Sequence, residues 1–522
     1  MTDERNPGAG ARPADRFVEL DPALHPDGPA GAETHLSVVL FAGTRAYKLY
    51  KPFDAGFVDA TTLEQRLALC RRELEQNRRF APDVYLGVLH LVDDAGSVHD
   101  HALVMRRMPP ERRLARLLNT AEAPDRLREI AKRIAAVHAA APRLSTEQAD
   151  AACSVEAVRT NWRDNFAVLD PLAGTVLDAG EVDRVHTLAE RYLDGAGELF
   201  AARIAAGWAI DGHGDLLAED IFCLEDGPRI LDCLAFDDRL RHGDVLADLA
   251  FLAMDVERLA GVEAAQSLVR WYHEFSNEQH PGSLAHHYVA YRANVRAKVA
   301  AIRHRQGDPD AAALAAEFHR RCRDHLERAR VRFVLVGGTP ATGKSTLAAL
   351  LGQAADWTVL RSDELRRELD GLPADSAAAP PSVAAPAPPG AAAPAAYGTG
   401  RYEPDAVGRV YRVLLERAER LAARGETVIL DASWVDARWR DEARRSAERA
   451  RAELVELRCD APFDVVEARI ERRRVEGRDP SEATAEVARA MRERLDPWPE
   501  ATTIDTTHPI ERSIAHAIER AR

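Results

Sequence analysis

The chain has 522 residues, of which 46% are hydrophobic and 30% are charged. At roughly 150 residues per domain, this length allows two to four domains with sizeable cores and excludes a fibre or a mini-protein. The 84 acidic and 70 basic side chains give a formal net charge of -14 at pH 7, which disfavours a globally basic nucleic-acid-binding protein.

The six cysteines are scattered and form no Cys-x-x-Cys pair, which argues against a disulfide framework and a structural zinc site. The polar N-terminus lacks the apolar run of a signal peptide, and nowhere do about 20 apolar residues occur together. The sequence therefore predicts a soluble cytoplasmic protein. We expect reduced thiols in its core, at Cys70, Cys153, Cys223, Cys233, Cys322 and Cys459.

The start of the chain changes character after residue 30. Residues 1–30 are rich in Gly, Pro, Ala and charge without apolar periodicity, so we expect a flexible leader. Two β-rich runs follow at 36–41 and 45–50, and the short Ala-Gly-Thr between them is typical of a hairpin. From 62 to 80 apolar residues recur at helical spacing, which predicts a helix.

A second strand pair is predicted at 84–92 and 102–107, and mostly helical sequence follows from about 114 to 200. After the region 210–236, strongly helical segments resume. The first domain, residues 31–330, is therefore predicted to be a small β-rich lobe followed by a larger helical lobe.

The second domain is predicted at 331–522, because the chain restarts near Val331 with the β-run 333–336 and a glycine-containing turn. Residues 374–396 inside it are almost entirely Ala and Pro. This composition offers too little large apolar surface to offset the entropy of ordering, so we expect a disordered insertion there.

A phosphate-binding motif follows the β-run. The sequence matches Gly-x-x-x-x-Gly-Lys-Ser/Thr between a strand and a helix, where glycines let backbone N–H groups surround phosphate. Lys344 is expected to reach the β- and γ-phosphates, and Ser345 the Mg²⁺ ion. We assign nucleotide binding to Gly338, Thr339, Pro340, Ala341, Thr342, Gly343, Lys344, Ser345 and Thr346.

Two aspartates end or follow further β-runs of this domain. Asp431, at the tip of a buried run, is expected to orient the metal, with a cap or turn role as the alternative. Asp363 is a candidate general base for an acceptor hydroxyl, and Arg366 and Arg367 are suited to binding anionic groups. The alternative for these three residues is a helix cap and a solvated basic face.

A basic run comprises Arg469, Arg472, Arg473, Arg474 and Arg478. Arginines on a mobile lid suit the neutralisation of charge on a transferring phosphoryl group, and we assign catalytic roles to Arg472 and Arg478. A solvated helix face is the alternative.

Residues 331–522 resemble the predicted P-loop kinase family that includes gluconate-kinase-like, zeta-toxin-like and polynucleotide 5′-kinase-like enzymes. The resemblance implies ATP-dependent phosphorylation with no particular acceptor. It rests on Ser362-Asp363-Glu-Leu-Arg366, Tyr397-Gly-Thr-Gly-Arg-Tyr402, Leu430-Asp431-Ala-Ser-Trp434 and Arg478-Asp479-Pro480-Ser481-Glu482-Ala483.

The first domain contains a second candidate site around His213-Gly-Asp215-Leu. Asp215 on such a loop is expected to accept the proton of an acceptor hydroxyl, and Asp220 and Asp232 to bind Mg²⁺. Lys48 on a strand is expected to contact the α/β-phosphates, held by an ion pair with Glu73 on the next helix. The triplet alone is equally compatible with a structural turn.

Over roughly residues 34–300 this order of residues resembles the aminoglycoside phosphotransferase family, which implies a two-lobed protein-kinase-like fold. The family usually has Asn where this chain has Asp220, and no Gly-x-Gly-x-x-Gly precedes Lys48. The nucleotide is then expected under the hairpin Ala42-Gly43-Thr44, or the site is degenerate. The match rests on Thr34-His35, Tyr47-Lys48, Glu73, Asn77, His213-Gly-Asp-Leu216 and Asp244-Val-Leu-Ala-Asp248-Leu-Ala-Phe-Leu-Ala-Met-Asp255.

The two-part order resembles bacterial bifunctional aminoglycoside phosphotransferase/ATP-binding proteins over nearly the whole chain. The predicted fold class is α/β and α+β, with a two-lobed protein-kinase-like domain before a P-loop kinase domain containing a parallel sheet. We expect a kinase that uses ATP and Mg²⁺ to phosphorylate a small hydroxylated metabolite. Two alternatives stay open: a P-loop enzyme regulated by a non-catalytic kinase-like sensor, and a 5′-hydroxyl nucleic-acid kinase, which the acidic charge makes unlikely. The sequence leaves the acceptor and the oligomeric state open.

Overall fold

The fold was analysed on a computed structural model, which describes residues 30–33, 36–54, 56, 58–371, 403–476 and 484–521. The predicted leader, apart from Ala30, and the predicted insertion 374–396 lie outside the described residues.

The chain divides into two compact units. The first comprises Met1–Val158 and Arg203–Gln279, and the second comprises Arg159–Ala202 and His280–Arg522. The domain boundary proposed after Arg330 lies inside the second unit and stays a prediction.

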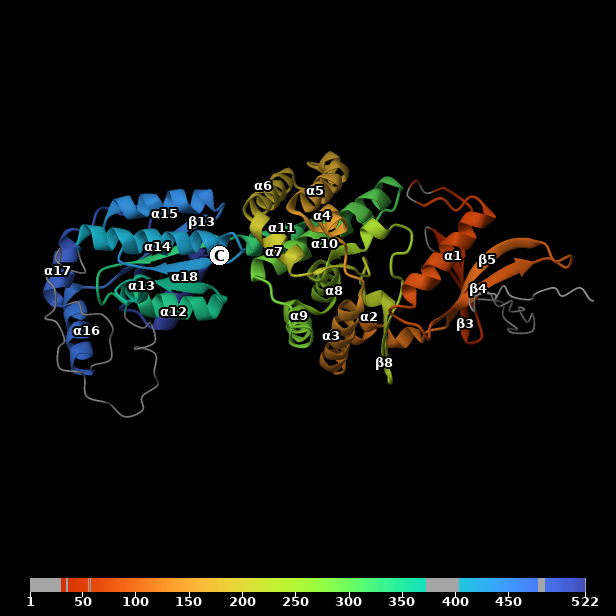
Figure 1. The fold of residues 1–522 in the computed structure, drawn as a ribbon, viewed down its shortest axis with the longest axis horizontal. Coiled ribbons are helices and arrows are strands. Elements are labelled where there is room, and N and C mark those ends of the chain that lie inside the picture. The colour runs from red at the N-terminus through yellow and green to blue at the C-terminus, as the bar shows by residue number, and fades with distance from the viewer. Residues whose placement is uncertain are drawn as a thin grey trace, which may run out of the picture. The chain divides into compact units, whose positions relative to one another are not determined.

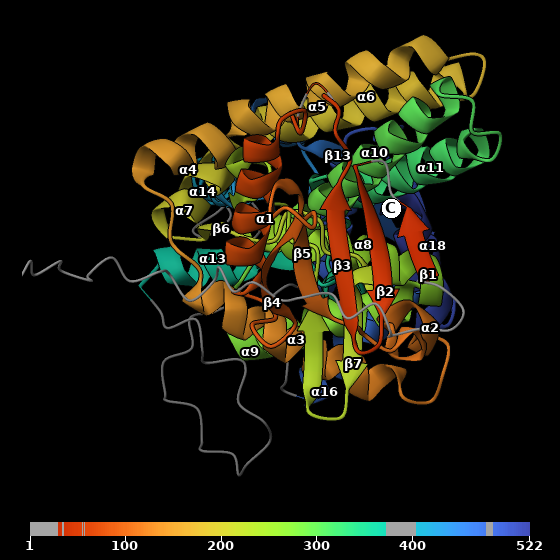
Figure 2. The same cartoon turned by 90° about the vertical axis from the view of Figure 1, so that its right-hand side faces the viewer.

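The first unit begins with an antiparallel sheet of order β1-β2-β3-β5-β4 (Figure 2). Both predicted strand pairs are confirmed, although the second strand of the second pair begins at Val98 rather than at residue 102. The edge strand β1 was not predicted. The strands are β1 (Ala30–Glu33), β2 (Ser37–Ala42), β3 (Arg45–Tyr50), β4 (Tyr85–Val92) and β5 (Val98–Arg106).

The predicted helix after the hairpin is α1 (Leu63–Asn77), which lies beside this sheet (Figure 2). It begins with a capping box, because the Thr62 hydroxyl accepts from the Gln65 N–H while the Gln65 side chain accepts from the Thr62 N–H. Its apolar face, with Cys70 and Leu74, is buried against the sheet. The small β-rich lobe is therefore confirmed.

The rest of the first unit is mainly helical, with two short antiparallel strand pairs around the Asp215 loop. The helix α8 (Val245–Ala260) is its buried centre, with twelve buried residues in succession from Val245 to Val256. The other elements are α2 (Leu114–Leu117), α3 (Ala123–Ala140), α4 (Thr146–Cys153), β6 (Ala209–Asp211), β7 (Ile221–Leu224), β8 (Gly227–Ile230), β9 (His242–Asp244) and α9 (Val262–Ser276). Two helices, α5 (Val155–Leu169) and α7 (Gly197–Ala205), continue from one unit into the other.

The second unit contains a five-stranded parallel sheet of order β11-β12-β10-β13-β14, as predicted for the P-loop domain. Its central strand is the apolar run predicted from sequence, and all four side chains from Phe333 to Val336 are fully buried. Such continuous burial is typical of a parallel strand covered on both faces. The strands are β10 (Arg332–Gly337), β11 (Thr358–Arg361), β12 (Val428–Asp431), β13 (Glu453–Asp460) and β14 (Thr502–Asp505).

Alternate residues of the central strands face two separate cores. Phe333 and Leu335 pack against α14 and α15, whereas Val334 and Val336 pack against α12 and α18. In Figure 1 the helices α14 and α15 lie above α12. The helices of this unit are α6 (Ala179–Gly195), α10 (Gly282–Arg305), α11 (Ala311–Ala329), α12 (Lys344–Ala355), α13 (Ser362–Leu369), α14 (Pro404–Ala422), α15 (Ala437–Arg449), α16 (Phe463–Glu476), α17 (Ala485–Glu493) and α18 (Ile510–Ala521).

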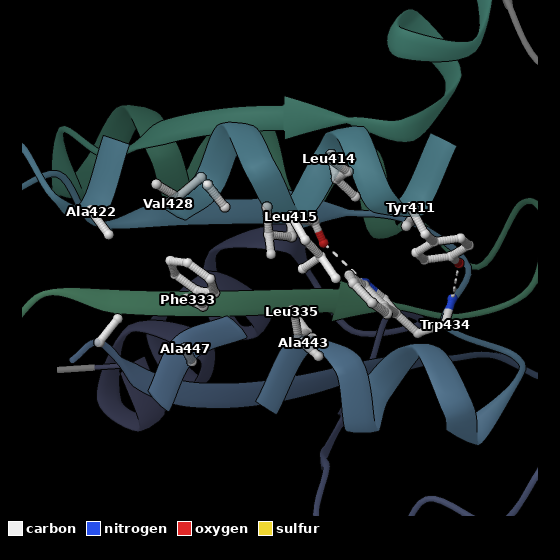
Figure 3. Packing of buried hydrophobic residues seen from close by; sticks show 14 of the residues in the cluster. Phe333, Leu335, Tyr411, Leu414, Leu415, Ala422, Val428, Trp434, Ala443 and Ala447 are labelled. Atoms are coloured by element: carbon white, nitrogen blue, oxygen red, sulfur yellow. Dashed lines mark hydrogen bonds between the residues drawn. The ribbon is translucent and has the colours of Figure 1, made fainter. Parts of the chain in front are cut away.

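The first core also fixes the chain just after β12 (Figure 3). The Trp434 indole N–H donates to the Leu430 carbonyl at 3.1 Å, and the Trp434 backbone N–H donates to the Tyr411 hydroxyl at 3.0 Å. These bonds hold Trp434 in the left-handed region, at φ 52°. The carboxyl end of β12, which carries Asp431, is thereby fixed.

The structure also bears on the cysteines and on whether a helix could cross a membrane. All six cysteines are buried free thiols, as expected. Among the described residues, no helix combines the length and the apolar character that crossing a membrane requires.

Candidate active sites

The P-loop motif connects β10 to α12, the strand–helix position that its sequence context predicted. Gly338 has φ 140°, and a Cβ there would lie 2.6 Å from the Cys459 carbonyl oxygen. Gly343 also has a positive φ, 92°. Because α12 begins at Lys344, the loop ends at a helix N-terminus, where free N–H groups favour an anion.

Thr506, just after β14, supports this loop from outside. Its hydroxyl donates to the Thr342 carbonyl at 2.7 Å. Arg469 donates to the Ala341 carbonyl at 3.3 Å and to the Thr506 carbonyl at 2.6 Å. Burial, followed by the charges of two nearby arginines on α16, lowers the pKa of Arg469. Sequence reasoning missed Thr506, for which no motif gave a signal.

The other residues of the predicted lid are placed only in part. Arg472 and Arg473 lie on α16. Arg478 and the side chain of Arg474 lie outside the described residues.

Asp431 is the last residue of β12, at the carboxyl edge of the parallel sheet beside β10. It is 3% exposed, and one carboxylate oxygen accepts from the Arg361 Nε at 3.3 Å. Its other oxygen, Oδ1, is buried without a hydrogen-bond partner among the described residues. A buried carboxylate oxygen without a donor fits Mg²⁺, which prefers oxygen ligands, and the Ser345 hydroxyl is a further donor of that kind. Arg361 was not predicted.

Asp363 lies in the first turn of α13, while the N-cap position belongs to Arg361. Its carboxylate accepts from Arg366 at 3.0 Å, and Arg367 donates to its carbonyl at 3.4 Å. The structure thus brings the candidate base together with the two predicted arginines, on a helix that follows the strand next to β12.

The first unit contains the predicted Lys48–Glu73 ion pair, with 2.8 Å between Nζ and Oε1. Lys48 also lies 3.0 Å from Asp232 Oδ1, and Tyr50 donates to the second oxygen of Glu73 at 2.5 Å. Burial alone would lower the pKa of Lys48, but Asp232 and Glu73 raise it well above its usual value. The strand lysine is therefore held as a cation between two carboxylates.

Asp232 also lies close enough to Asp220 for their charges to interact, as does Asp215. Burial, and then the charges of Asp232 and Asp215, raise the pKa of Asp220 well above its usual value. The Lys48 charge lowers the pKa of Asp232. Carboxylates that repel one another in this way fit a divalent cation, for which Asp220 and Asp232 supply hard oxygen donors.

The loop that carries Asp215 is held by α8. The backbone N–H groups of His213 and Gly214 donate to the two oxygens of Asp248, each at 2.8 Å. His138 lies 3.2 Å from Asp248 as well. Burial opposes ionisation of Asp248, but these partners lower its pKa below the usual value. Asp248 is one of the residues on which the family resemblance rests, but the sequence assigned it no role. In the structure it holds the loop that carries Asp215.

Comparison with known proteins agrees with this two-part fold. Residues 333–498 match a family model described as an AAA domain. Over 487 residues the chain is 39% identical to Uncharacterized protein Rv2004c of Mycobacterium tuberculosis (strain ATCC 25618 / H37Rv), which covers 93% of this chain and 94% of that protein.

Two solved kinase structures show a distant similarity to parts of the chain. A choline/ethanolamine kinase family protein from Mesorhizobium loti is 19% identical, covering 58% of this chain and 90% of its own, with a TM-score of 0.38. The APS kinase CysC of Mycobacterium tuberculosis is 19% identical, covering 37% of this chain and 98% of its own, with a TM-score of 0.27. Identity and coverage against Rv2004c show that the chain belongs to the same family as that protein over nearly its full length.

Proposed function

We propose that the protein is an ATP- and Mg²⁺-dependent kinase that transfers the γ-phosphoryl group of ATP to a hydroxyl group of a small metabolite. The observation that carries the proposal is at the carboxyl edge of the parallel sheet. There the glycine-framed loop after β10 lies beside Asp431, whose buried Oδ1 has no hydrogen-bond partner among the described residues. Such an edge is where α/β folds bind nucleotides.

In this site Lys344 binds the β- and γ-phosphates, and the loop N–H groups orient them. Ser345 and Asp431 would hold Mg²⁺, which supplies charge neutralisation of the phosphates when bound. Asp363 accepts the proton of the acceptor hydroxyl as that oxygen bonds to the γ-phosphorus and the bond to the bridging oxygen of ADP breaks. Arg366 orients anionic groups of the acceptor. Arg472 on α16 is suited to neutralising charge on the transferred group.

We infer that the first unit performs a second phosphoryl transfer, for which the Lys48–Glu73 pair and its contact with Asp232 are the supporting observation. Lys48 binds the α- and β-phosphates there, and Asp220 and Asp232 would hold the divalent cation. Asp215 accepts the acceptor proton. The word aminoglycoside in the family name refers to relatives of the fold and does not identify the acceptor of this protein.

The test is transfer of labelled γ-phosphate from ATP to a panel of aminoglycosides, amino sugars, sugar acids, nucleosides and 5′-hydroxyl oligonucleotides. Wild type is compared with Lys344→Ala, Asp215→Ala and, as a matched control on the exposed face of α3, Lys132→Ala. We expect distinct products to be lost with Lys344→Ala and with Asp215→Ala, and none with the control.

Three results would contradict parts of this proposal. Loss of every product with Lys344→Ala alone would make the first unit a regulator rather than an enzyme. Salt-sensitive labelling of oligonucleotides only would favour the nucleic-acid kinase. ATP hydrolysis without any labelled acceptor would favour a regulatory NTPase.

A further inference from the structure

Asp232 has an unusual backbone conformation for a residue with a side chain. Its φ of 63° lies in the left-handed region, which costs a non-glycine residue free energy unless its surroundings fix it. In this conformation its carboxylate reaches Lys48 at 3.0 Å. The conformation and the position of the carboxylate are therefore linked.

Two side chains of the β-rich lobe hold the backbone at this point. The Asp232 N–H donates to the Tyr85 hydroxyl at 3.0 Å. The next N–H, of Cys233, donates to Asn77 Oδ1 at 2.8 Å, and the Asn77 amide donates back to the Cys233 carbonyl at 3.3 Å. Asn77 is fully buried and Tyr85 is 2% exposed, so neither side chain exchanges these bonds for water.

The position of Tyr85 explains how it can act at a distance from the reacting groups. It is the first residue of β4, and its ring packs in the core between the sheet and α1 with Leu74 and Leu103. A neutral hydroxyl on a rigid ring is a fixed acceptor for one backbone N–H.

We propose that Tyr85 is a positioning residue of the first unit's site, whose hydroxyl fixes Asp232 in its left-handed conformation and so aims the carboxylate at a bound divalent cation. The proposal rests on the phosphotransferase function proposed for this unit. Without the hydroxyl, the Asp232 N–H is left without its partner, and the backbone is free to relax toward negative φ. That movement carries the carboxylate away from Lys48 and from the cation.

The alternative is that Tyr85 serves only the core and its hydroxyl bond has no consequence. Tyr85→Phe separates the two readings, because it keeps the buried ring and removes a single oxygen. Tyr47→Phe is the matched control, since Tyr47 is also a buried tyrosine of the same sheet but packs in a different cluster, with Leu89 and Val104.

The experiment measures Mn²⁺ binding to the full-length protein from the loss of the free Mn²⁺ signal in electron paramagnetic resonance, with β,γ-imido-ATP present. All variants carry Lys344→Ala and Ser345→Ala, which remove the metal–nucleotide site of the P-loop. We expect Tyr85→Phe to raise the Kd for Mn²⁺ roughly 10-fold, as loss of a residue that orients a metal ligand typically does. Asp232→Asn should abolish binding, and Tyr47→Phe should leave the Kd unchanged.

Turnover gives a second readout. In the same background, the Mg²⁺ concentration for half-maximal rate should rise with Tyr85→Phe, and excess Mg²⁺ should restore most of the rate. A thermal midpoint close to that of Tyr47→Phe shows that the fold is intact.

The outcomes separate this inference from the function on which it rests. If Asp232→Asn loses Mn²⁺ while Tyr85→Phe binds it like the parent, Tyr85 is only a core residue and the proposed function stands. If the folded parent binds no Mn²⁺ in this background, the function of the first unit fails and the positioning role fails with it. The P-loop site is unaffected by either result.

Discussion

The two candidate sites are built in opposite ways. The P-loop site uses consecutive backbone groups between β10 and α12, and its shape depends on two glycines with positive φ, Gly338 and Gly343. The site of the first unit instead brings together Lys48, Glu73 and Asp232 from a strand, a helix and a distant loop. A backbone site keeps its shape when a side chain changes, whereas a site of paired charges depends on every partner.

The largest contrast should come from the two nucleotide-binding lysines. Lys48→Met leaves buried Glu73 and the neighbouring Asp232 without their cation, and breaking a buried ion pair costs about 3 kcal/mol or more. Lys344→Met should leave the free energy of unfolding nearly unchanged, because Lys344 forms no ion pair with any residue that the structure describes. Urea unfolding of both variants, followed by circular dichroism, measures the difference. Equal free energies of unfolding for Lys48→Met and Lys344→Met would contradict this prediction.

Gly338→Ala tests the backbone of the P-loop at a position where a side chain does not fit. A Cβ would lie 2.6 Å from the Cys459 carbonyl oxygen, at a φ that alanine rarely adopts. Strain of about 1–3 kcal/mol should weaken ATP binding roughly 5- to 150-fold, measured by calorimetry with Asp232→Asn in the background to remove metal–nucleotide binding in the first unit. Gly282→Ala, at a position with open space for a Cβ, is the control and should bind ATP like the parent.

Asp248→Asn tests the side-chain support of the first unit's loop. An amide keeps one acceptor oxygen but loses the second, so one of the two bonds from His213 and Gly214 is lost, at about 2 kcal/mol for a bond to a charged group. Products of the first unit should fall while those of the P-loop site persist. Undiminished first-unit products in a folded variant would show that the loop does not need this anchor.

The contribution of Asp248 to the stability of the fold should depend on pH. Because the folded state lowers the pKa of Asp248, its ionised form stabilises the fold fully above the unfolded pKa of about 3.9 and loses that contribution as the pH falls through the folded value. The stability advantage of wild type over Asp248→Asn should therefore be constant near neutral pH and shrink below about pH 4. Urea unfolding at pH 7 and pH 3.5 measures it.

Sequence reasoning reached the parts of both sites that local patterns encode. The P-loop is contiguous, so its motif and its strand–helix context could be read directly, and the parallel sheet followed from the buried run at 333–336. Lys48, Glu73 and Asp232 were predicted from their order along the chain, as a strand lysine, a helix glutamate and an aspartate at a later strand. Their pairing required the fold, because the lysine and Asp232 are 184 residues apart in sequence.

What sequence reasoning missed are the supports of these residues. Tyr85 and Thr506 each act through a single hydroxyl on the backbone of a distant segment, 147 and 164 residues away. A tyrosine at the start of a strand and a threonine after one fit the core and turn patterns equally well without such a role. The Tyr85 bond matters because Asp232 has a positive φ. This conformation is a consequence of tertiary structure, which composition does not encode.

The smallest effect is expected from the side-chain support of the P-loop itself. Thr506→Val keeps the volume next to Gly343 but removes the hydroxyl that donates to the Thr342 carbonyl and accepts from Arg469, which keeps its own bond to the Ala341 carbonyl. A neutral hydrogen bond contributes about 1 kcal/mol, so the KM for ATP at the P-loop site should rise about fivefold with little change in kcat. Steady-state kinetics with an acceptor of the P-loop site measures both constants, and Thr507→Val, whose hydroxyl donates to exposed Asp505, is the neighbouring control. Because the glycines and the flanking strand hold the loop without Thr506, a loss as large as that of Gly338→Ala would mean that the P-loop depends on its side-chain partners as strongly as the first unit's site does.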